Sequence, residues 1–468
     1  MSGKTRYLGV AAAALALYAA TTHPRVFAAG NDASRWAQVE SLVDHGTASI
    51  EHSRFRQTVD RVEIGGRVYS NKPPALAFLG AALSWPLEAT TGWRLGDPET
   101  AGRAIWVLTL LLVGVPGALT VATFDCALRR FHGVGRPLRA GLTVALGAGT
   151  LLLSFAGTFQ SHVPAAFLLL LALLAALDGR AGASGLWAGL AGALDLLPGF
   201  GLAPFLAAIA VGGEARRRRR ALPRFAAGLG VGLVVAVAAN LATTGSPLPP
   251  KMVPGAIDAA AAAGPSVAGV VLPQSAGYPL EILFGPHGLF TVSPVLVFGL
   301  LGLLVCCWRP HFARPAAWRW LALGILVQVA GHALLAGSYG GWSYGYRYLL
   351  PIQPLLLFAA PAVLVARPLK VAFAALLPVS VLFAALGAFH PWPPAFEQAT
   401  QVDPVAATVR NPIGGNAAAL AEQKLPGGRL ASGLGARWVD PDPEVRRRYY
   451  RLFFASKGDL ETMRRFER

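Results

Sequence analysis

The chain has 468 residues, of which 54% are hydrophobic and only 14% are charged, and its formal net charge is +17. Soluble domains carry about 25% charged residues, so this composition excludes an ordinary globular enzyme and indicates a protein with many membrane-spanning helices. The excess Arg and Lys residues fall in short loops between apolar runs. Such loops set membrane topology and meet anionic lipids, and the absence of a basic face with interleaved aromatic residues argues against nucleic acid as a partner.

The first apolar run covers residues 7–29 and follows Lys4 and Arg6. Positive charge before a hydrophobic run keeps the N-terminus in the cytoplasm, so this run is expected to cross the membrane outward. The alternative is a cleaved signal peptide with a weak cleavage site at residues 26–28. Both interpretations place the chain outside the membrane from Asn31 onward.

Residues 31–74 form a polar island that opens the first predicted outer loop, residues 30–101. Asp32 comes directly after the first span, where a partly dry environment raises a carboxyl pKa toward the range of a general base. The same residue is also placed to cap an amphipathic helix. Lys72 precedes the apolar run 74–91, at a depth where a cation either binds a lipid phosphate or simply extends to the interface.

Ten further runs are candidate spans: 102–128, 138–157, 163–178, 184–199, 200–213, 222–242, 288–307, 316–337, 348–366 and 369–388. The run 74–91 would be about 27 Å long as a helix, which is marginal for a bilayer core of about 30 Å. If it crossed, every later Arg-rich loop would move outside, against the positive-inside rule. We therefore expect 74–91 to be a juxtamembrane or re-entrant helix in an all-α polytopic protein with about eleven transmembrane helices.

This topology collects the unusual polar residues on the outer side. Besides the island, the outer loops are 157–164, the turn at Asp195, 243–290 and 337–347. Residues 1–388 are predicted to form the transmembrane domain. Residues 389–468 contain no run that could span, so we expect a small extracytoplasmic domain there, with mixed α/β structure as our interpretation of its composition.

Several outer-loop residues are candidates for substrate contact. His162 lies in SFAGTFQSHVPAAF, although a lone His at an interface is more often packed and hydrogen-bonded. Arg347 closes the loop GGWSYGYRYLLP, where its guanidinium suits two-point contact with a phosphate and is equally placed to anchor an aromatic belt. The remaining candidates for substrate binding are Arg35, Tyr344, Tyr346, Glu281 and His287.

The order of these features resembles the membrane-embedded glycosyltransferases of the GT-C class, in particular the bacterial protein-mannosyltransferase-like and aminoarabinose-transferase-like branch. The resemblance covers residues 7–390. It rests on an acidic residue directly after the first helix, an amphipathic loop, and the sequence KPP that opens an apolar helix. The residues that carry it are Asn31 to Arg35, Ser41 to Val43, Asp60 and Tyr69 to Pro74, with His162 and GWSYGYRYLLP in later outer loops.

The resemblance implies a multi-pass enzyme of the plasma (inner) membrane with an extracytoplasmic active site and C-terminus. The donor would be a sugar on a polyprenyl-phosphate lipid, and the acceptor a hydroxyl of a lipid, glycan or protein. Asp32 would take the acceptor proton while the anomeric carbon inverts. Lys72 and Arg347 would hold the phosphate, and Asp60 and His162 would orient the sugar or the acceptor.

The chain departs from this family pattern at two positions. Ala33 stands where many relatives carry a second acid, and His162 stands where some relatives carry Asp. These departures leave open whether a divalent metal takes part. Two other functions also stay open: a transporter or lipid flippase, for which mid-span polar residues such as Asp195 and Gln328 are few, and a non-catalytic scaffold whose C-terminal domain recruits partners.

Overall fold

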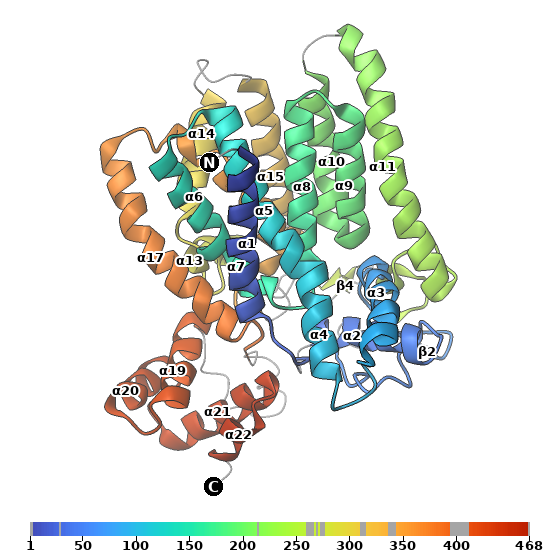
Figure 1. Ribbon diagram of the computed structural model, residues 1–468, viewed down its shortest axis with the longest axis vertical. Helices are drawn as coiled ribbons and strands as arrows, with labels where there is room; N and C mark the ends of the chain where they lie inside the picture. Colours follow the sequence, from blue (N-terminus) through green and yellow to red (C-terminus); the bar gives the residue numbers. More distant parts are fainter. Residues whose placement is uncertain are drawn as a thin grey trace.

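The computed structural model describes residues 3–27, 30–212, 215–258, 266–267, 270–271, 277–308, 315–335, 343–393 and 411–466. Within these residues the fold is almost entirely helical, with long helices packed side by side in one bundle (Figure 1). The prediction of a mostly helical protein is confirmed. Short helices and a small sheet gather at one end of the bundle, which we call the α2 end.

The bundle is built from helices that follow one another through short turns. They are α1 (Gly3–Thr21), α4 (Ala101–Thr109), α5 (Val115–His132), α6 (Arg136–Ala148), α7 (Leu151–Ala156), α8 (His162–Leu177), α9 (Ala181–Leu194), α10 (Leu196–Val211), α11 (Ala215–Thr244), α14 (Leu296–Trp308), α15 (Pro315–Leu335) and α17 (Arg367–Phe389). A π-helical turn, η1 (Leu110–Gly114), joins α4 to α5. Three short pieces lie between α15 and α17, namely η4 (Arg347–Ile352), α16 (Gln353–Leu357) and η5 (Ala360–Ala362).

The remaining elements are shorter. They are α2 (Gly30–Asp44), β1 (Arg61–Ile64), β2 (Arg67–Ser70), α3 (Ala75–Thr91), η2 (Pro250–Met252), β3 (Ile257–Asp258), β4 (Ser266–Val267), β5 (Val270–Val271), α12 (Tyr278–Phe284), α13 (Leu289–Val292), α19 (Pro412–Lys424), α20 (Arg429–Trp438), α21 (Pro443–Lys457) and α22 (Leu460–Arg464).

Among the described residues, three helical segments are long and apolar enough to cross a membrane, namely 101–132, 219–244 and 367–389. A fourth is added if 278–292 and 296–308, which meet at 107°, count as one broken span. Shorter apolar helices, α8, α9 and α10, lie between them in sequence. The chain is therefore a multi-pass membrane protein, while the number of eleven spans stays a prediction.

The predicted spans 138–157 and 348–366 are among those that are not single helices. The run 138–157 breaks between α6 and α7 at Thr150, whose side chain caps the new helix by accepting from the N–H of Leu152. The run 348–366 is instead divided among η4, α16 and η5. Its sequence contains three prolines, Pro351, Pro354 and Pro361, and each removes a backbone donor and clashes with the preceding turn.

The first outer loop contains a sheet that the all-α prediction missed. β1 and β2 form an antiparallel hairpin whose register pairs Arg61 with Ser70 and Ile64 with Arg67. The turn is Gly65-Gly66, with φ of 59° and 77°, which a two-residue hairpin turn requires and glycine supplies without strain. β3 adds a third strand beside β1, so the loop 243–290 is joined to the first outer loop by backbone pairing.

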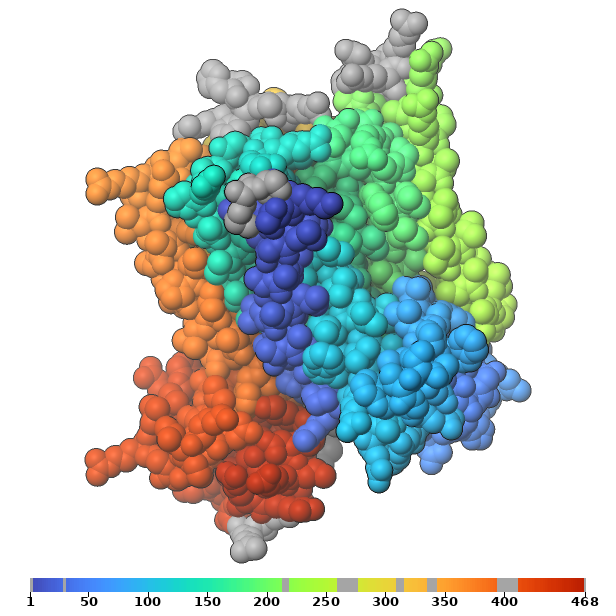
Figure 2. Space-filling model, viewed as in Figure 1, coloured from blue at the N-terminus to red at the C-terminus, as the bar shows by residue number. Residues whose placement is uncertain are grey.

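The described part of the C-terminal region, residues 411–466, is helical, so the interpretation of mixed α/β structure is wrong there. Side chains of Asn411, Asp442 and Asp459 cap its helices by accepting from N–H groups of the first turns, as these residue types commonly do. The helices have their own core around Phe453 and Phe454. They lie at the α2 end, beside the first outer loop (Figures 1 and 2).

The two ends of the bundle differ as the predicted topology requires. α2, α3, the hairpin and the C-terminal helices share one end, with α3 packed on α2. α11, which opens with the sequence ARRRRR at residues 215–220, begins at the opposite end (Figure 1). Which end faces the cytoplasm stays a prediction from the charge distribution.

Helices α9 and α11 approach each other through glycine. A Cβ on Gly232 would lie 1.9 Å from the carbonyl carbon of Gly189, and one on Gly185 would lie 2.1 Å from the carbonyl oxygen of Phe225. Small residues let helix backbones touch within a membrane, where packing rather than water exclusion drives association.

We expect Gly232→Leu to force α9 and α11 apart and to destabilise the protein by at least about 2 kcal/mol, as overpacked interiors do. Thermal unfolding of the detergent-solubilised protein would measure this as a lower transition temperature. Gly230→Leu is the matched control, because it is on the same helix and nothing lies within 4 Å of its added Cβ. Equal shifts for the two variants would contradict the contact.

Candidate active site

Asp32 is buried at the start of α2, with 2% of its surface exposed. One carboxylate oxygen, Oδ2, accepts a hydrogen bond from the N–H of Phe27 at 3.0 Å. The other, Oδ1, accepts from the N–H of Phe159 at 3.3 Å. Burial raises the pKa of Asp32 to about 7, against the lowering effect of these two backbone donors. The carboxyl therefore joins the exit of α1 to the loop before α8 and also titrates near neutral pH.

Arg35 lies one turn further along α2 and is 3% exposed. Its Nη2 donates to Ser161 Oγ at 3.0 Å, and its Nη1 donates to the carbonyl of Pro73 at 3.3 Å. Burial lowers the pKa of Arg35 to about 10, which leaves it charged at neutral pH. The guanidinium thus ties α2 to the start of α3 and to the start of α8.

Asp60 and Lys72 form an ion pair with a distance of 2.8 Å between Oδ1 and Nζ. The β1–β2 hairpin brings them together, since Asp60 precedes β1 and Lys72 follows β2. Burial alone would raise the pKa of Asp60, but the Lys72 ammonium lowers it overall. Burial lowers the pKa of Lys72, partly offset by Asp60. Asn71 Nδ2 donates to Asp60 at 3.4 Å and to Asp258 at 3.2 Å, which adds a residue after β2 and one from β3.

His162, at the start of α8, lies between a carboxylate and a guanidinium. Its Nδ1 is hydrogen-bonded to Asp195, which separates α9 from α10. Its Nε2 accepts from Arg347 Nε at 3.3 Å. Because Nε2 accepts, the ring proton belongs on Nδ1, where it donates to Asp195. Asp195 thereby fixes the ring that holds Arg347.

Arg347 is 1% exposed and is enclosed by aromatic rings. Its Cζ lies 4.4 Å from the ring centroid of Trp392 and 5.1 Å from that of Tyr348. Its Nη1 is buried and has no hydrogen-bond partner among the described residues. Buried polar atoms are nearly always paired, so this unpaired nitrogen is a feature that needs an explanation.

Trp392 is held by the C-terminal helices. The backbone N–H of Trp392 donates to His390 Nδ1 at 3.3 Å. Because Nδ1 accepts, the ring proton of His390 belongs on Nε2. That nitrogen donates to Ser456 Oγ at 2.9 Å and lies 3.2 Å from the carbonyl of Phe453, both on α21. Trp392 therefore connects the C-terminal region to the guanidinium of Arg347.

The other predicted binding residues have contacts of their own. Tyr344 donates its hydroxyl to the carbonyl of Phe383 at 2.7 Å, and His287 Nδ1 is bonded to the carbonyl of Ser343 at 2.8 Å. Tyr346 places its hydroxyl 3.0 Å from that of Tyr278. Glu281 is half-buried on α12. The structure thus places Tyr344 and His287 in contacts that shape the loop before Arg347.

The sequence analysis left three residues of the cluster out of the site. Asp195 is the single carboxylate in residues 181–212, and a lone charge in an apolar stretch is a functional signal that could have found it. Tyr348 follows Arg347 directly in the sequence, and its ring lies 5.1 Å from the guanidinium. Trp392 lies beyond the predicted transmembrane domain, and no sequence signal joined it to Arg347.

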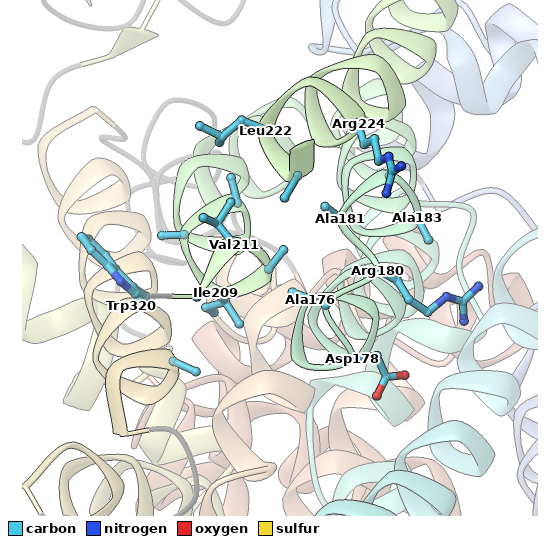
Figure 3. A pocket seen from close by; sticks show the side chains of 18 of the residues that line it. Ala176, Asp178, Arg180, Ala181, Ala183, Ile209, Val211, Leu222, Arg224 and Trp320 are labelled. Atoms are coloured by element: carbon cyan, nitrogen blue, oxygen red, sulfur yellow. The ribbon is translucent and has the colours of Figure 1, made fainter. Parts of the chain in front are cut away.

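Two cavities in the described part of the chain lie outside this cluster. Among the described residues, no group of three or more His, Cys, Asp or Glu side chains is placed to hold a metal ion. A cavity of about 810 Å³ lies beside the site, between Phe27, Ala33, Trp93 and the C-terminal residues Ala455 and Gly458. A larger cavity of about 1470 Å³ lies at the other end of α8 to α10 (Figure 3).

The fold can be compared with solved structures. No protein-family model matches the chain, and no curated protein matches it. The crystal structure of ArnT from Cupriavidus metallidurans in the apo state is similar, with a TM-score of 0.51 and 17% identity over 99% of this chain and 78% of that chain. The same protein bound to undecaprenyl phosphate gives a TM-score of 0.51 and 17% identity over 98% and 77% of the two chains.

A third structure, the apo oligosaccharyltransferase from Archaeoglobus fulgidus, has a TM-score of 0.46 and 14% identity over 93% of this chain and 60% of that chain. That score is too low to support an argument. The two ArnT structures confirm the fold expected from the resemblance. Over nearly its whole length, the chain has the fold of ArnT.

Proposed function

We propose that the protein transfers a sugar from a polyprenyl-phosphate-linked donor to a hydroxyl of a lipid, glycan or protein acceptor at the α2 end, which faces the cell exterior. The fold supports this proposal, and so does the undecaprenyl phosphate bound to the ArnT that shares it. The observation that carries the proposal is the buried Arg347 Nη1 without a partner among the described residues.

The charges around Arg347 explain why a phosphate fits. Two buried cations, Arg35 and Arg347, and the half-buried Lys72 share the site, where Lys72 pairs with Asp60. Among the described residues, no ion pair joins Arg347 to a carboxylate. Burying a charge without a partner costs several kcal/mol. A lipid phosphate would supply an anion for Arg347, and a guanidinium binds phosphate strongly through two parallel N–H donors.

The same geometry supports a single displacement. The acceptor oxygen forms a bond to the anomeric carbon as the bond from that carbon to the phosphate oxygen breaks, with its electron pair leaving on polyprenyl phosphate. Asp32 takes the acceptor proton, and the anomeric carbon inverts. Arg347 and Lys72 stabilise the negative charge that develops on the leaving phosphate.

Asp60 and His162 take a different part from the one that the resemblance implied. Asp60 is bound to Lys72, and His162 is bound to Arg347. We therefore propose that they position the two phosphate-binding cations, with Asp195 fixing the His162 ring.

The proposal is tested with the purified full-length protein in liposomes that contain a radiolabelled polyprenyl-phosphate sugar. We expect label to move onto an acceptor lipid or peptide glycan supplied in a membrane extract, with release of polyprenyl phosphate. Movement of intact donor across the bilayer without bond cleavage would identify a transporter or flippase instead. Absence of both would contradict a role in polyprenyl-phosphate chemistry.

Trp392→Ala should weaken donor binding, because it removes the ring that faces the Arg347 guanidinium. A desolvated cation–π contact contributes about 2 kcal/mol, so we expect KM for the donor to rise about tenfold to thirtyfold with a smaller change in kcat. Trp392→Phe should restore most of the affinity. Trp85→Ala is the matched control, since Trp85 on α3 is 74% exposed. An unchanged KM in Trp392→Ala would contradict this role.

A further inference from the structure

A large cavity lies at the end of the bundle opposite the candidate active site. It has a volume of about 1470 Å³ and is enclosed by the end of α8, the start of α9, the end of α10, α11 and the start of α15. Cavities that hold drug-sized molecules measure about 300–1,000 Å³, so this one has room for a longer ligand.

The walls of the cavity are apolar because the helices contribute small side chains there. Figure 3 shows these short side chains pointing inward, together with Val211 and Ile209. The alanines that α8, α9 and α10 contribute to the lining are Ala176, Ala181, Ala183, Ala207, Ala208 and Ala210. An apolar hollow of this kind, at the end of transmembrane helices, suits acyl chains.

The rim of the cavity is positively charged. Arg180, Arg220 and Arg224 line it and are exposed, and Figure 3 shows Arg180 and Arg224 at its edge. None of the three is ion-paired or hydrogen-bonded through its side chain to another described residue. The one carboxylate in the lining, Asp178, is paired with Arg130 at 2.8 Å.

The position of the rim is set by helix packing. A Cβ on Gly228 would lie 2.2 Å from the carbonyl oxygen of Gly182, so α11 rests directly on the start of α9. This contact brings Arg224 of α11 beside the turn that carries Arg180. Trp320 stands on α15 among the lining residues and is 43% exposed, as is common for tryptophan at the membrane–water interface.

We propose that this cavity binds an anionic glycerophospholipid, with its acyl chains between the alanines and its phosphate and headgroup against Arg180, Arg220 and Arg224. Basic pockets between transmembrane helices bind anionic headgroups. A zwitterionic lipid would bring its own cation to a rim that is already positive. This site is separate from the proposed transfer reaction, and its test measures lipid binding without any turnover.

The test is thermal unfolding of the purified full-length protein in detergent, titrated with dioleoyl phosphatidylglycerol or with dioleoyl phosphatidylcholine. We expect phosphatidylglycerol to raise the transition temperature at a concentration at least about tenfold lower than phosphatidylcholine, since each arginine at a membrane surface contributes about 1 kcal/mol toward anionic lipid. If both lipids raised the transition temperature at the same concentration, the proposal would be overturned.

Arginine variants test whether the rim of the cavity causes the preference for phosphatidylglycerol. The triple variant Arg180→Gln/Arg220→Gln/Arg224→Gln should lose the preference for phosphatidylglycerol. The triple variant Arg129→Gln/Arg136→Gln/Arg367→Gln removes the same charge from exposed positions on other helices and should keep it. The proposal is wrong if both triples lose the preference equally, which would indicate diffuse attraction, or if the first triple keeps it.

A substitution inside the hollow gives an independent readout. Ala208→Phe fills part of the cavity without changing charge, so it should weaken stabilisation by both lipids. Mass spectrometry of the intact protein would count bound phosphatidylglycerol directly, with fewer bound molecules expected for Ala208→Phe and for the first triple than for the unmodified protein. Unchanged occupancy in both variants would place the lipid elsewhere.

Discussion

Replacing Arg347 with Gln is expected to reduce kcat/KM for sugar transfer by at least about a thousandfold while leaving the protein folded. The variant loses the buried nitrogen that faces no partner among the described residues and the charge that would stabilise the leaving phosphate. Removing one preorganised donor costs about 10²–10³ in kcat, and loss of the full charge adds to this. Arg347→Lys should recover only part of the activity, because an ammonium lacks the planar fork of donors.

The thermal stability of Arg347→Gln distinguishes a phosphate-binding role of Arg347 from a structural role. Burying a charge that has no ionic partner costs several kcal/mol, so the transition temperature of Arg347→Gln should stay level or rise. Arg61→Gln is the matched control, because Arg61 is exposed on β1 at the same end of the bundle. Parallel loss of stability and activity in Arg347→Gln would show that the guanidinium serves the fold instead.

Asp32→Asn is expected to lower kcat by about 10²–10⁴-fold, the usual contribution of a positioned general base. The unmodified enzyme should also gain activity as pH rises through about 7, since the base must be deprotonated and burial raises the pKa of Asp32 to about 7. Below that value the rate should fall tenfold per pH unit. A pH–rate profile between pH 5 and 9 measures both effects.

The pH dependence of the free energy of unfolding gives an independent test of the raised Asp32 pKa. Because the pKa of Asp32 is raised above its ordinary value, the folded state binds the proton more tightly than the unfolded state, so this group contributes stability that is lost as pH rises through about 7. Asp32→Asn removes that dependence. It also turns an amide NH₂ toward one of two backbone donors, the N–H of Phe27 or of Phe159, at a cost of about 1–3 kcal/mol.

Asp97 in the same outer loop provides the control for this prediction. Asp97→Asn makes the same chemical change on a half-buried carboxylate whose partners are Glu99 and Thr100, and it should alter neither the rate nor its pH dependence. Full activity in Asp32→Asn would leave Asp32 as a structural link between α1, α2 and the loop before α8, and the base would have to be sought elsewhere.

The sequence predicts those parts of the site that depend on local structure. Asp32 follows the first helix as expected. The hairpin that joins Asp60 to Lys72 is absent from the all-α prediction, although Gly65-Gly66 between two short β-prone runs is a local signal for it. The breaks in the run 348–366 are likewise visible as prolines, although a hydropathy window averages over them. These features depend on neighbours along the chain, so pattern and turn chemistry are sufficient.

The remaining contacts depend on how helices pack, which periodicity does not encode. His162 and Asp195 are 33 positions apart and meet only because α8, α9 and α10 fold back on one another. Trp392 reaches Arg347 from a segment beyond the last predicted span, held by His390 and α21. No local sequence pattern predicts either contact. The sequence therefore indicates Arg347 and His162 as candidates, but not the residues that they contact.

The central claim is that one buried cluster of cations binds a lipid phosphate, and a structure of the protein with a polyprenyl phosphate bound tests it most directly. We predict the phosphate within hydrogen-bonding distance of Arg347 Nη1 and Lys72 Nζ, with Asp32 on the side from which an acceptor approaches. A phosphate bound at the opposite end of the bundle, or at the α2 end without contact to Arg347, would contradict the account.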